Sequence, residues 1–183
     1  MEHTPERIKA MQKIKILGIS GSLRSNSSTR IIMNAVCSLA GDTVDFKIFE
    51  DLASMPPFDD SNTIPGEVEE FRQQLKEADG IFFVSPEYAF GVPGSLKNAL
   101  DWTVSSGELV NKPAALVVAA TGGENAYQSW QLIFKALSLK INEESKLLIS
   151  FVRSKLNHEG KITDFKTEEG LKNVLNDLIR SIQ

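Results

Sequence analysis

This chain of 183 residues has few cysteines and histidines and no excess of basic residues. The single cysteine, Cys37, excludes an internal disulfide and agrees with a reducing compartment. Its place in a helical apolar pattern favours core packing over a reactive thiol. Lys and Arg number 20 against 24 Asp and Glu, so the net charge is −4 and a nucleic-acid partner is not expected. His3 and His158 are expected to be solvated, because neither is placed for proton transfer.

Long apolar runs are also missing. The opening segment MEHTPERIKAMQK has no run of the kind that a secretory signal needs, and no stretch approaches the ~20 apolar residues of a membrane span. We therefore expect a soluble, cytoplasmic protein with no membrane partner. Residues 1–12 are expected to be an N-terminal tail, and residues 13–183 one domain, because no repeat, low-complexity tract or linker divides them.

Strand and helix patterns alternate along the rest of the chain. Apolar or alternating runs predict strands at residues 13–20, 43–50, 81–85, 113–120 and 146–152. Helices are predicted at residues 29–40, 67–78 and 94–104, around 130–137, and around 171–182. Gly41 is expected to end the first helix. This alternation predicts an α/β fold: a doubly wound, five-stranded parallel sheet with helices on both faces.

Three loops follow predicted strands and would share one edge of that sheet. With the strand order 2-1-3-4-5, residues 21–28, 86–93 and 121–125 adjoin the crevice where the order reverses, which is where such sheets bind ligands. The sequence therefore predicts a single binding site built from these loops.

The first loop, GSLRSNSST, precedes a helix and is rich in hydroxyl groups. A helix N-terminus has unpaired N–H groups and a partial positive charge, so hydroxyls and one arginine beside it could hold a phosphate. The candidate residues are Ser22, Arg24, Ser27, Ser28 and Thr29. The alternative is that these serines only cap the helix.

The second loop, SPEYAFGVPG, contains nothing suited to acid–base or nucleophilic chemistry, but its backbone could lie along a flat ligand. Pro86, Glu87, Tyr88 and Ala89 are its candidates. Thr121, Gly122 and Gly123 form the third loop, where the glycine pair would allow close approach. Together the loops describe a site for a phosphorylated aromatic ligand such as FMN.

The sequence of the first loop does not match the motifs of two common classes of nucleotide-binding protein. A P-loop hydrolase needs GK[ST] there, and GSLRSNSS has no lysine. A Rossmann dehydrogenase needs G-x-G-x-x-G, for which Gly18 and Gly21 are wrongly spaced.

The two longest motifs resemble those of a known family. GSLRSNSST resembles the GSxRxxSxN loop, and SPEYAFGVPGSLKNALDW the PEYNxSxPGxLKNAxDW segment, of the NADPH-dependent FMN reductases, which include related quinone, azo and chromate reductases. The likeness spans roughly residues 13–180. It implies a flavodoxin-like fold and bound FMN, with hydride taken from NADPH or NADH at flavin N5. Electrons would pass by a ping-pong route to a flavin, quinone, azo compound or metal oxyanion. A homodimer or homotetramer is implied as well.

The resemblance also assigns roles to individual positions. Ser22, Arg24 and Ser27 would hold the FMN phosphate, and the backbone of Pro86, Glu87 and Tyr88 would lie along the ring. Gly122 and Gly123 match a third loop less firmly. No metal ligand or strictly catalytic residue is implied, and Glu87 is expected to act through its backbone or a subunit contact rather than as a general base. Lys97 and Asp101 would form a surface ion pair or a subunit contact.

This sequence departs from the family at two places. Thr29 replaces the usual asparagine of the phosphate loop, and Ala89-Phe90-Gly91 replaces a stretch with Asn and Ser at its ends. The acceptor and the choice of NADH or NADPH therefore stay open. An FMN-binding electron carrier or flavin-dependent sensor without nicotinamide turnover is the alternative function. Electron carriers of this fold are usually much more acidic than −4, which favours the enzyme.

Overall fold

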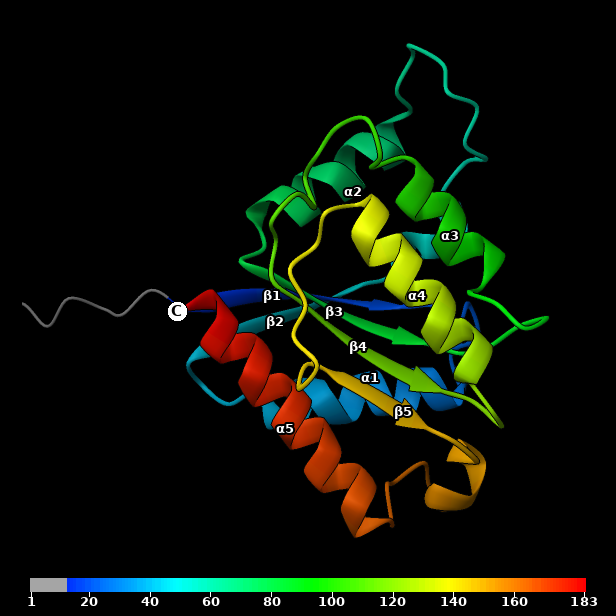
Figure 1. The fold of residues 1–183 in the computed structure, drawn as a ribbon, viewed down its shortest axis with the longest axis vertical. Helices are drawn as coiled ribbons and strands as arrows, with labels where there is room; N and C mark the ends of the chain where they lie inside the picture. Colours follow the sequence, from blue (N-terminus) through cyan, green and yellow to red (C-terminus); the bar gives the residue numbers. More distant parts are fainter. Residues whose placement is uncertain (1–12) are drawn as a thin grey trace, which may run out of the picture.

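The computed structural model describes residues 13–183. Its centre is a sheet of five parallel strands in the order β2-β1-β3-β4-β5, as the sequence predicts (Figure 1). The strands are β1 (Ile14–Ser20), β2 (Val44–Phe49), β3 (Gly80–Ser85), β4 (Ala114–Ala119) and β5 (Lys146–Ile149). In the register of the sheet, Gly18 of β1 lies between Ile48 of β2 and Phe82 of β3.

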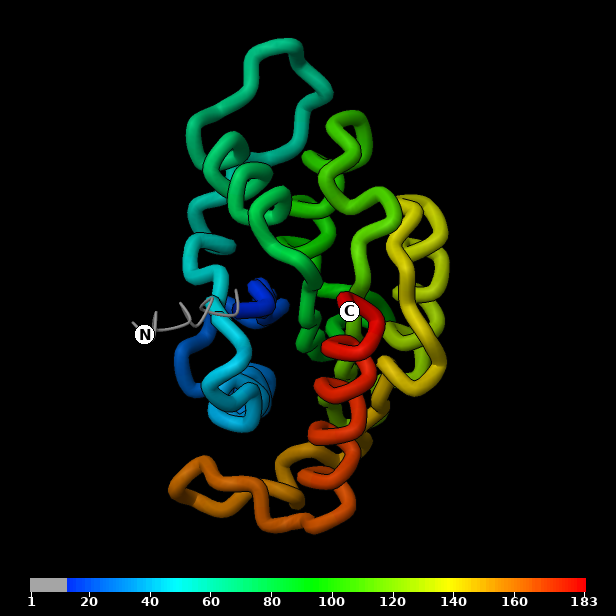
Figure 2. The backbone as a smooth tube through the Cα atoms, turned by 90° about the vertical axis from the view of Figure 1, so that its left-hand side faces the viewer, coloured from blue at the N-terminus to red at the C-terminus, as the bar shows by residue number. Residues whose placement is uncertain are grey.

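Helices cover both faces of this sheet (Figure 1). They are α1 (Ser28–Leu39), α2 (Gly66–Glu77), α3 (Gly94–Asp101), α4 (Glu124–Ala136) and α5 (Phe165–Ile182), with short 3₁₀ turns η1 (Asp51–Ser54) and η2 (Val152–Lys155). The helices α1 and α5 pack on one face, and α2, α3 and α4 on the other. Figure 2 shows the segment between β5 and α5 at the bottom of the view, below α1.

Two apolar clusters, one on each face, hold these layers together. Every residue of β3 and of β4 is buried, which explains why these strands have unbroken apolar sequences. On the α2–α4 face the largest buried side chains include Phe71, Trp102 and Trp130. The opposite cluster is mostly aliphatic, with Ile32 and Val36 of α1, and includes the fully buried Phe82 of β3.

Most predicted boundaries agree with the structure. The helices predicted around residues 130–137 and 171–182 begin earlier, at Glu124 and Phe165, and two elements end earlier than predicted. The third helix ends at Asp101 rather than near residue 104, where the chain continues as turns. The last strand ends at Ile149 rather than at 152, because Phe151 adopts a left-handed conformation (φ 53°) that turns the chain into η2. Gly41 follows the end of α1 with φ 67°, as expected for the residue that stops a helix.

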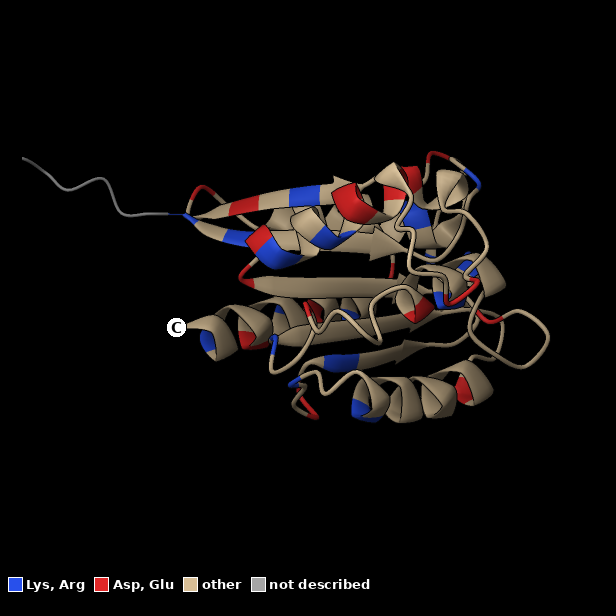
Figure 3. Cartoon of the chain, turned by 90° about the horizontal axis from the view of Figure 1, so that it is seen from above, with Lys and Arg blue, Asp and Glu red and all other residues tan. Residues whose placement is uncertain are grey.

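Other expectations concern single residues and the chain terminus. Cys37 is half-buried, with its Sγ 3.9 Å from the carbonyl oxygen of Phe46. The predicted tail, residues 1–12 with His3, lies outside the described residues. Acidic and basic side chains are interspersed over the elements (Figure 3). Within residues 13–183, no helix combines the length and apolarity needed to cross a bilayer.

Candidate functional site

A cavity of about 190 Å³ lies at the carboxyl edge of the sheet, where the loops after β1, β3, β4 and β5 meet. Because β1 and β3 are neighbours while β2 lies beyond β1, the strand order reverses here. Nine predicted site residues line this cavity: Ser22, Arg24, Ser27, Ser28, Thr29, Pro86, Glu87, Tyr88 and Thr121. The structure thus brings all three predicted loops to one site. Ala89, Gly122 and Gly123 lie in the same loops but not in its lining.

The loop after β1 ends in the first turn of α1. Ser27 is the N-cap: its Oγ accepts a hydrogen bond from the N–H of Arg30 (3.2 Å) and lies 3.1 Å from Thr29 Oγ1. Both hydroxyls are buried, and Ser27 caps the helix, as one of the two predictions for this loop expects; its part in phosphate binding stays a prediction. Among the described side chains, none forms a hydrogen bond with the hydroxyl of Ser28 or the guanidinium of Arg24.

The first turn of α1 also contains no acidic residue. The nearby cation Arg30 pairs with Glu50 through an Nη1–Oε2 contact of 2.6 Å, and this hydrogen bond lowers the pKa of the Glu50 carboxyl. The helix N-terminus therefore keeps its partial positive charge toward the cavity.

The loop after β3 forms a tight hairpin. Tyr88 and Gly91 exchange two backbone hydrogen bonds of 3.0 Å, and between them Ala89 (φ 48°) and Phe90 (φ 59°) are both left-handed. Two consecutive left-handed residues define a type I′ turn, which normally has Asn or Gly at these positions. Ala89 and Phe90 therefore adopt a conformation that side chains with a Cβ rarely take. The hairpin directs Phe90 outward, where 79% of its surface is exposed.

Glu87 has a structural role that sequence reasoning missed. Its Oε2 accepts a hydrogen bond of 2.8 Å from the backbone N–H of Ala126, in the first turn of α4. Gly123, the N-cap of α4, supplies no side chain for this purpose, so Glu87 replaces it. No local pattern could show this contact, because the two residues are 39 positions apart.

The loop after β4 contributes one of its three predicted residues to the cavity lining. Thr121 lines the cavity, but Gly123 is needed for the fold: its φ is 112°, and a Cβ there would lie 2.6 Å from Leu148 Cδ1. A Cβ on Gly122 would instead meet the Glu124 carboxylate. Both glycines thus have little room for a side chain, and close approach of a ligand to their backbone stays a prediction.

Four lining residues were not predicted: Ala119, Ala120, Val152 and Arg153. Ala119 is the last residue of β4, and Ala120 follows it. The other two come from η2, after β5. Their place at the site could have been predicted, because a residue that follows a predicted parallel strand emerges at the same edge of the sheet as the other loops.

The charges around the cavity suit a phosphorylated, flat ligand. Arg24 and Arg153 both line it, and neither forms an ion pair within residues 13–183. Its one carboxylate, Glu87, is already bound to the N-terminus of α4. Two guanidinium groups, a helix N-terminus and hydroxyls form a set of donors typical of phosphate sites, and the backbone of residues 86–88 provides a wall for a ring.

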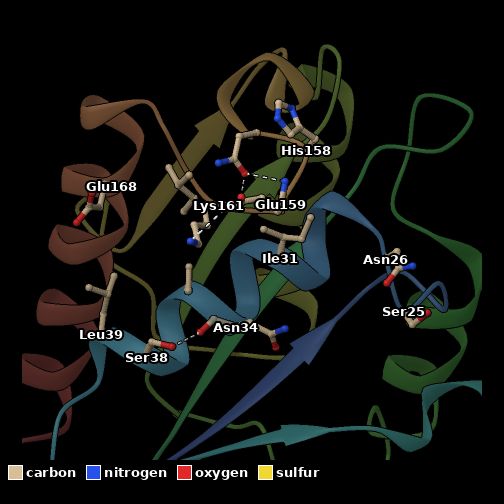
Figure 4. Close-up of a pocket in the computed structure, with 14 residues that line it drawn as sticks. Ser25, Asn26, Ile31, Asn34, Ser38, Leu39, His158, Glu159, Lys161 and Glu168 are labelled. Carbon is tan, nitrogen blue, oxygen red and sulfur yellow. Dashed lines mark hydrogen bonds and ion pairs between the residues drawn. The ribbon is translucent and has the colours of Figure 1, made fainter.

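A larger cavity, of about 830 Å³, lies elsewhere: between the outer side of α1 and the turn at residues 157–162 (Figure 4). Asn34 and Ser38 line it from α1, and His158 and Lys161 from the turn. His158 is exposed, as predicted. The groove is open and its polar groups are mixed in kind and charge, so they do not define a ligand.

The predicted ion pair between Lys97 and Asp101 forms on the exposed side of α3. Across residues 13–183, no group of three His, Cys, Asp or Glu residues is arranged to hold a metal ion.

The sequence of this chain is similar to those of known proteins. Residues 14–152 match the sequence model of a family described as NADPH-dependent FMN reductase. The chain is 33% identical to an NAD(P)H:quinone oxidoreductase of Solanum tuberosum, with 91% of each protein covered. It is 36% identical to an NADPH:quinone oxidoreductase of Arabidopsis thaliana, with 88% of each covered. An NAD(P)H-dependent FMN reductase of Pseudomonas aeruginosa is 31% identical, over 90% of this chain and 93% of that protein.

Among solved structures, the fold is similar to that of FerB, a flavoenzyme NAD(P)H:(acceptor) oxidoreductase from Paracoccus denitrificans. The TM-score is 0.81 with 21% sequence identity, over 92% of this chain and 97% of that one. At this identity the likeness concerns the fold alone, and it confirms the flavodoxin-like prediction.

Proposed function

The chain belongs to the NADPH-dependent FMN reductase family, and from this premise we propose that it oxidises NADPH or NADH and reduces a small quinone at the cavity described above. Family membership confirms the sequence-based predictions of an NAD(P)H-dependent oxidoreductase with FMN as cofactor. The quinone is proposed because two relatives above 30% identity are quinone oxidoreductases.

The observation that carries the proposal is the convergence of loops after four different strands on one cavity with two arginines and no free carboxylate. Ser22, Arg24, Ser28 and the first N–H groups of α1 would bind the FMN phosphate, with Ser27 and Thr29 shaping the turn behind them. Pro86, Glu87 and Tyr88 would support the ring through their backbone, and Thr121 would close the opposite side. Ala89, Gly122 and Gly123 hold these loops in shape.

When bound, FMN supplies the group that takes hydride from the nicotinamide and passes electrons to the acceptor. The protein's own task is to orient the partners and limit water. The Tyr88 hydroxyl lies 3.4 Å from the Ser22 hydroxyl, so the loop after β3, beside the ring, contacts the loop after β1, beside the phosphate. The Glu87 contact to Ala126 fixes the ring-side loop against α4. No side chain in the lining needs to act as a general acid or base, because Glu87 is engaged as a helix cap.

Nicotinamide and acceptor would use the same space beside the ring. Among residues 13–183, the family motifs account for one flavin cavity, and the larger groove beside α1 has no phosphate-binding loop of its own. We therefore expect ping-pong kinetics, in which the oxidised nicotinamide leaves before the acceptor enters.

Purification followed by a visible spectrum and a steady-state assay tests the proposal. Flavin absorbance near ~450 nm, with NADPH or NADH oxidation that depends on added quinone, is the expected result. The alternative function, an electron carrier or sensor, predicts the same absorbance without nicotinamide turnover. A protein that neither retains nor binds FMN would contradict both.

Subunit association is proposed at the exposed hairpin. Tyr88, which lines the cavity, and Phe90, in the same hairpin, are both exposed, and aromatic side chains are enriched in protein interfaces. A homodimer or homotetramer formed there would cover the ring edge of the site.

A further inference from the structure

Arg153 lies at a fixed place beside the cavity. It is the second residue of η2, directly after Val152, whose side chain is buried in the apolar cluster with α1 and α5. The N–H of Val152 donates a hydrogen bond of 3.1 Å to the carbonyl oxygen of Ala120, in the cavity wall. The backbone at residue 153 is therefore anchored, although the Arg153 side chain is exposed.

An unusual conformation at Phe151 makes this position possible. Its φ of 53° is one that bulky side chains rarely adopt. The conformation is held by three hydrogen bonds. The Phe151 N–H donates to the Thr121 carbonyl (2.9 Å), and the Phe151 carbonyl accepts from the N–H (2.9 Å) and the Oγ (2.8 Å) of Ser154. Without this sharp turn, β5 would continue along the sheet, and Arg153 would not lie beside the cavity. Strained backbone that is well supported by its surroundings is typical of functional sites.

Arg153 differs from the other cation of η2 in having no ion-pair partner within residues 13–183. Lys155, in the same 3₁₀ turn, pairs with Asp164 at 3.4 Å. Arg153 and Arg24 form no such pair within residues 13–183, yet both line one cavity of about 190 Å³. Two like charges near one another are unfavourable unless an anion lies between them. A phosphate monoester carries roughly 1.5 to 2 negative charges at pH 7, which matches the two guanidinium groups.

We propose that Arg153 is a second phosphate-binding arginine, which contacts the phosphate of FMN together with Arg24. This inference rests on the proposed function, because it assumes FMN in this cavity. It adds a contact from the loop after β5, outside the two sequence motifs that the family resemblance uses. The loops after β1 and β5 would then both hold the phosphate.

Flavin retention tests this role independently of activity. The full-length protein is loaded with FMN or, in parallel, with riboflavin, which lacks the phosphate, and the flavin released on dilution is measured by fluorescence. Arg153→Ala should weaken FMN binding roughly three- to tenfold, an effect between that of an exposed ion pair and that of a charge-assisted hydrogen bond. Riboflavin retention should not change, and the loss should shrink as salt screens the charges. Arg153→Lys should restore part of the FMN affinity.

Two further variants make the result unambiguous. Lys135→Ala removes an exposed cation from the last turn of α4, at the far end of that helix from the cavity, and should leave both flavins bound as before. Arg24→Ala reports on the proposed FMN site itself. If Arg24→Ala loses FMN selectively but Arg153→Ala does not, the inference is overturned while the FMN site stands. If neither Arg24→Ala nor Arg153→Ala weakens FMN binding more than riboflavin binding, the proposed phosphate site is wrong as well.

Two other outcomes also overturn the role of Arg153. Equal loss of FMN and riboflavin in Arg153→Ala would make the residue structural. A raised KM for NADPH with unchanged FMN retention would assign Arg153 to the dinucleotide instead.

Discussion

The carboxylate of Glu87 binds the backbone N–H of Ala126 at 2.8 Å, and through this contact the loop after β3 caps the helix after β4. Two walls of the cavity are thus joined by a single side chain. The contact also removes the only carboxylate in the cavity lining from reaction chemistry, since the charge is bound to a helix N-terminus, where it is stabilising.

Replacing Glu87 tests this role. Glu87→Ala should lower the free energy of unfolding by about 0.5–2 kcal/mol, the usual cost of losing a helix cap. It should also weaken flavin retention, because the ring-side loop loses its support. Glu87→Gln keeps an oxygen that can accept the same hydrogen bond, so it should retain most of the stability and turnover. A general base would behave differently: the glutamine variant would then be folded but nearly inactive.

Arg24→Ala should weaken FMN binding roughly ten- to hundredfold, because a charge-assisted contact to a phosphate contributes about 1.5–3 kcal/mol. Riboflavin has no phosphate, so its binding should be unchanged. The fluorescence of the flavin released on dilution measures the loss of FMN and, in parallel, of riboflavin. Proportional loss of FMN and riboflavin would show that Arg24 supports the loop rather than the phosphate.

Phe90→Asp should weaken subunit association and lower turnover together, because it places a charge at the centre of the proposed contact. Light scattering and the quinone assay are the two measurements. Phe165→Asp is a matched control, since Phe165 is similarly exposed (75%) but begins α5, away from the hairpin. If the unmutated protein is a monomer at micromolar concentration, the proposed contact is wrong.

Initial rates at several NADPH and quinone concentrations should give parallel double-reciprocal lines, the pattern of ping-pong exchange. The physical reason is that nicotinamide and acceptor both need the open side of the same ring. Intersecting lines, with a complex that holds both substrates at once, would instead require a separate nicotinamide site.

Asp177 should make stability depend on acidity. Its buried carboxylate accepts a hydrogen bond of 2.6 Å from Ser145 Oγ, and others from Asn142 and Arg180. The Ser145 hydrogen bond is the main cause that lowers the pKa of Asp177 below its usual value. The unfolded chain then binds this proton more readily, so the stabilisation is complete above the unfolded pKa of about 3.9 and is lost as pH falls through the lower, folded pKa.

Urea unfolding of the Asp177→Asn variant checks this prediction. At pH 7 the variant should be less stable by about 1–3 kcal/mol, the cost of losing hydrogen bonds to a charged group. The difference from the unmutated protein should shrink below about pH 4, where the aspartate of the unfolded chain takes up a proton before the folded one does. Glu169→Gln, at an exposed position of α5, is the control and should show no such convergence. A difference that stays constant at all pH values would mean that the ionisation of Asp177 does not stabilise the fold.

The sequence by itself determined the architecture and most of the site. The apolar runs of β3 and β4 and the helical spacing in α1 and α5 depend on local periodicity, which fixes which side of each element is buried. Parallel strands release their loops at one edge, so Ser22, Arg24, Pro86 and Thr121 could be assigned to one site before any contact was known.

The tertiary structure decided what depends on contacts between distant segments. Only the packed chain shows that Glu87 caps α4, that a Cβ at Gly123 would collide with Leu148, and that Ser27 uses its hydroxyl within its own helix. The same is true of Arg153, which reaches the cavity because Phe151 turns the chain after β5. Local periodicity carries no information about such contacts, since each depends on which residues the sheet and its helices bring together from far along the chain.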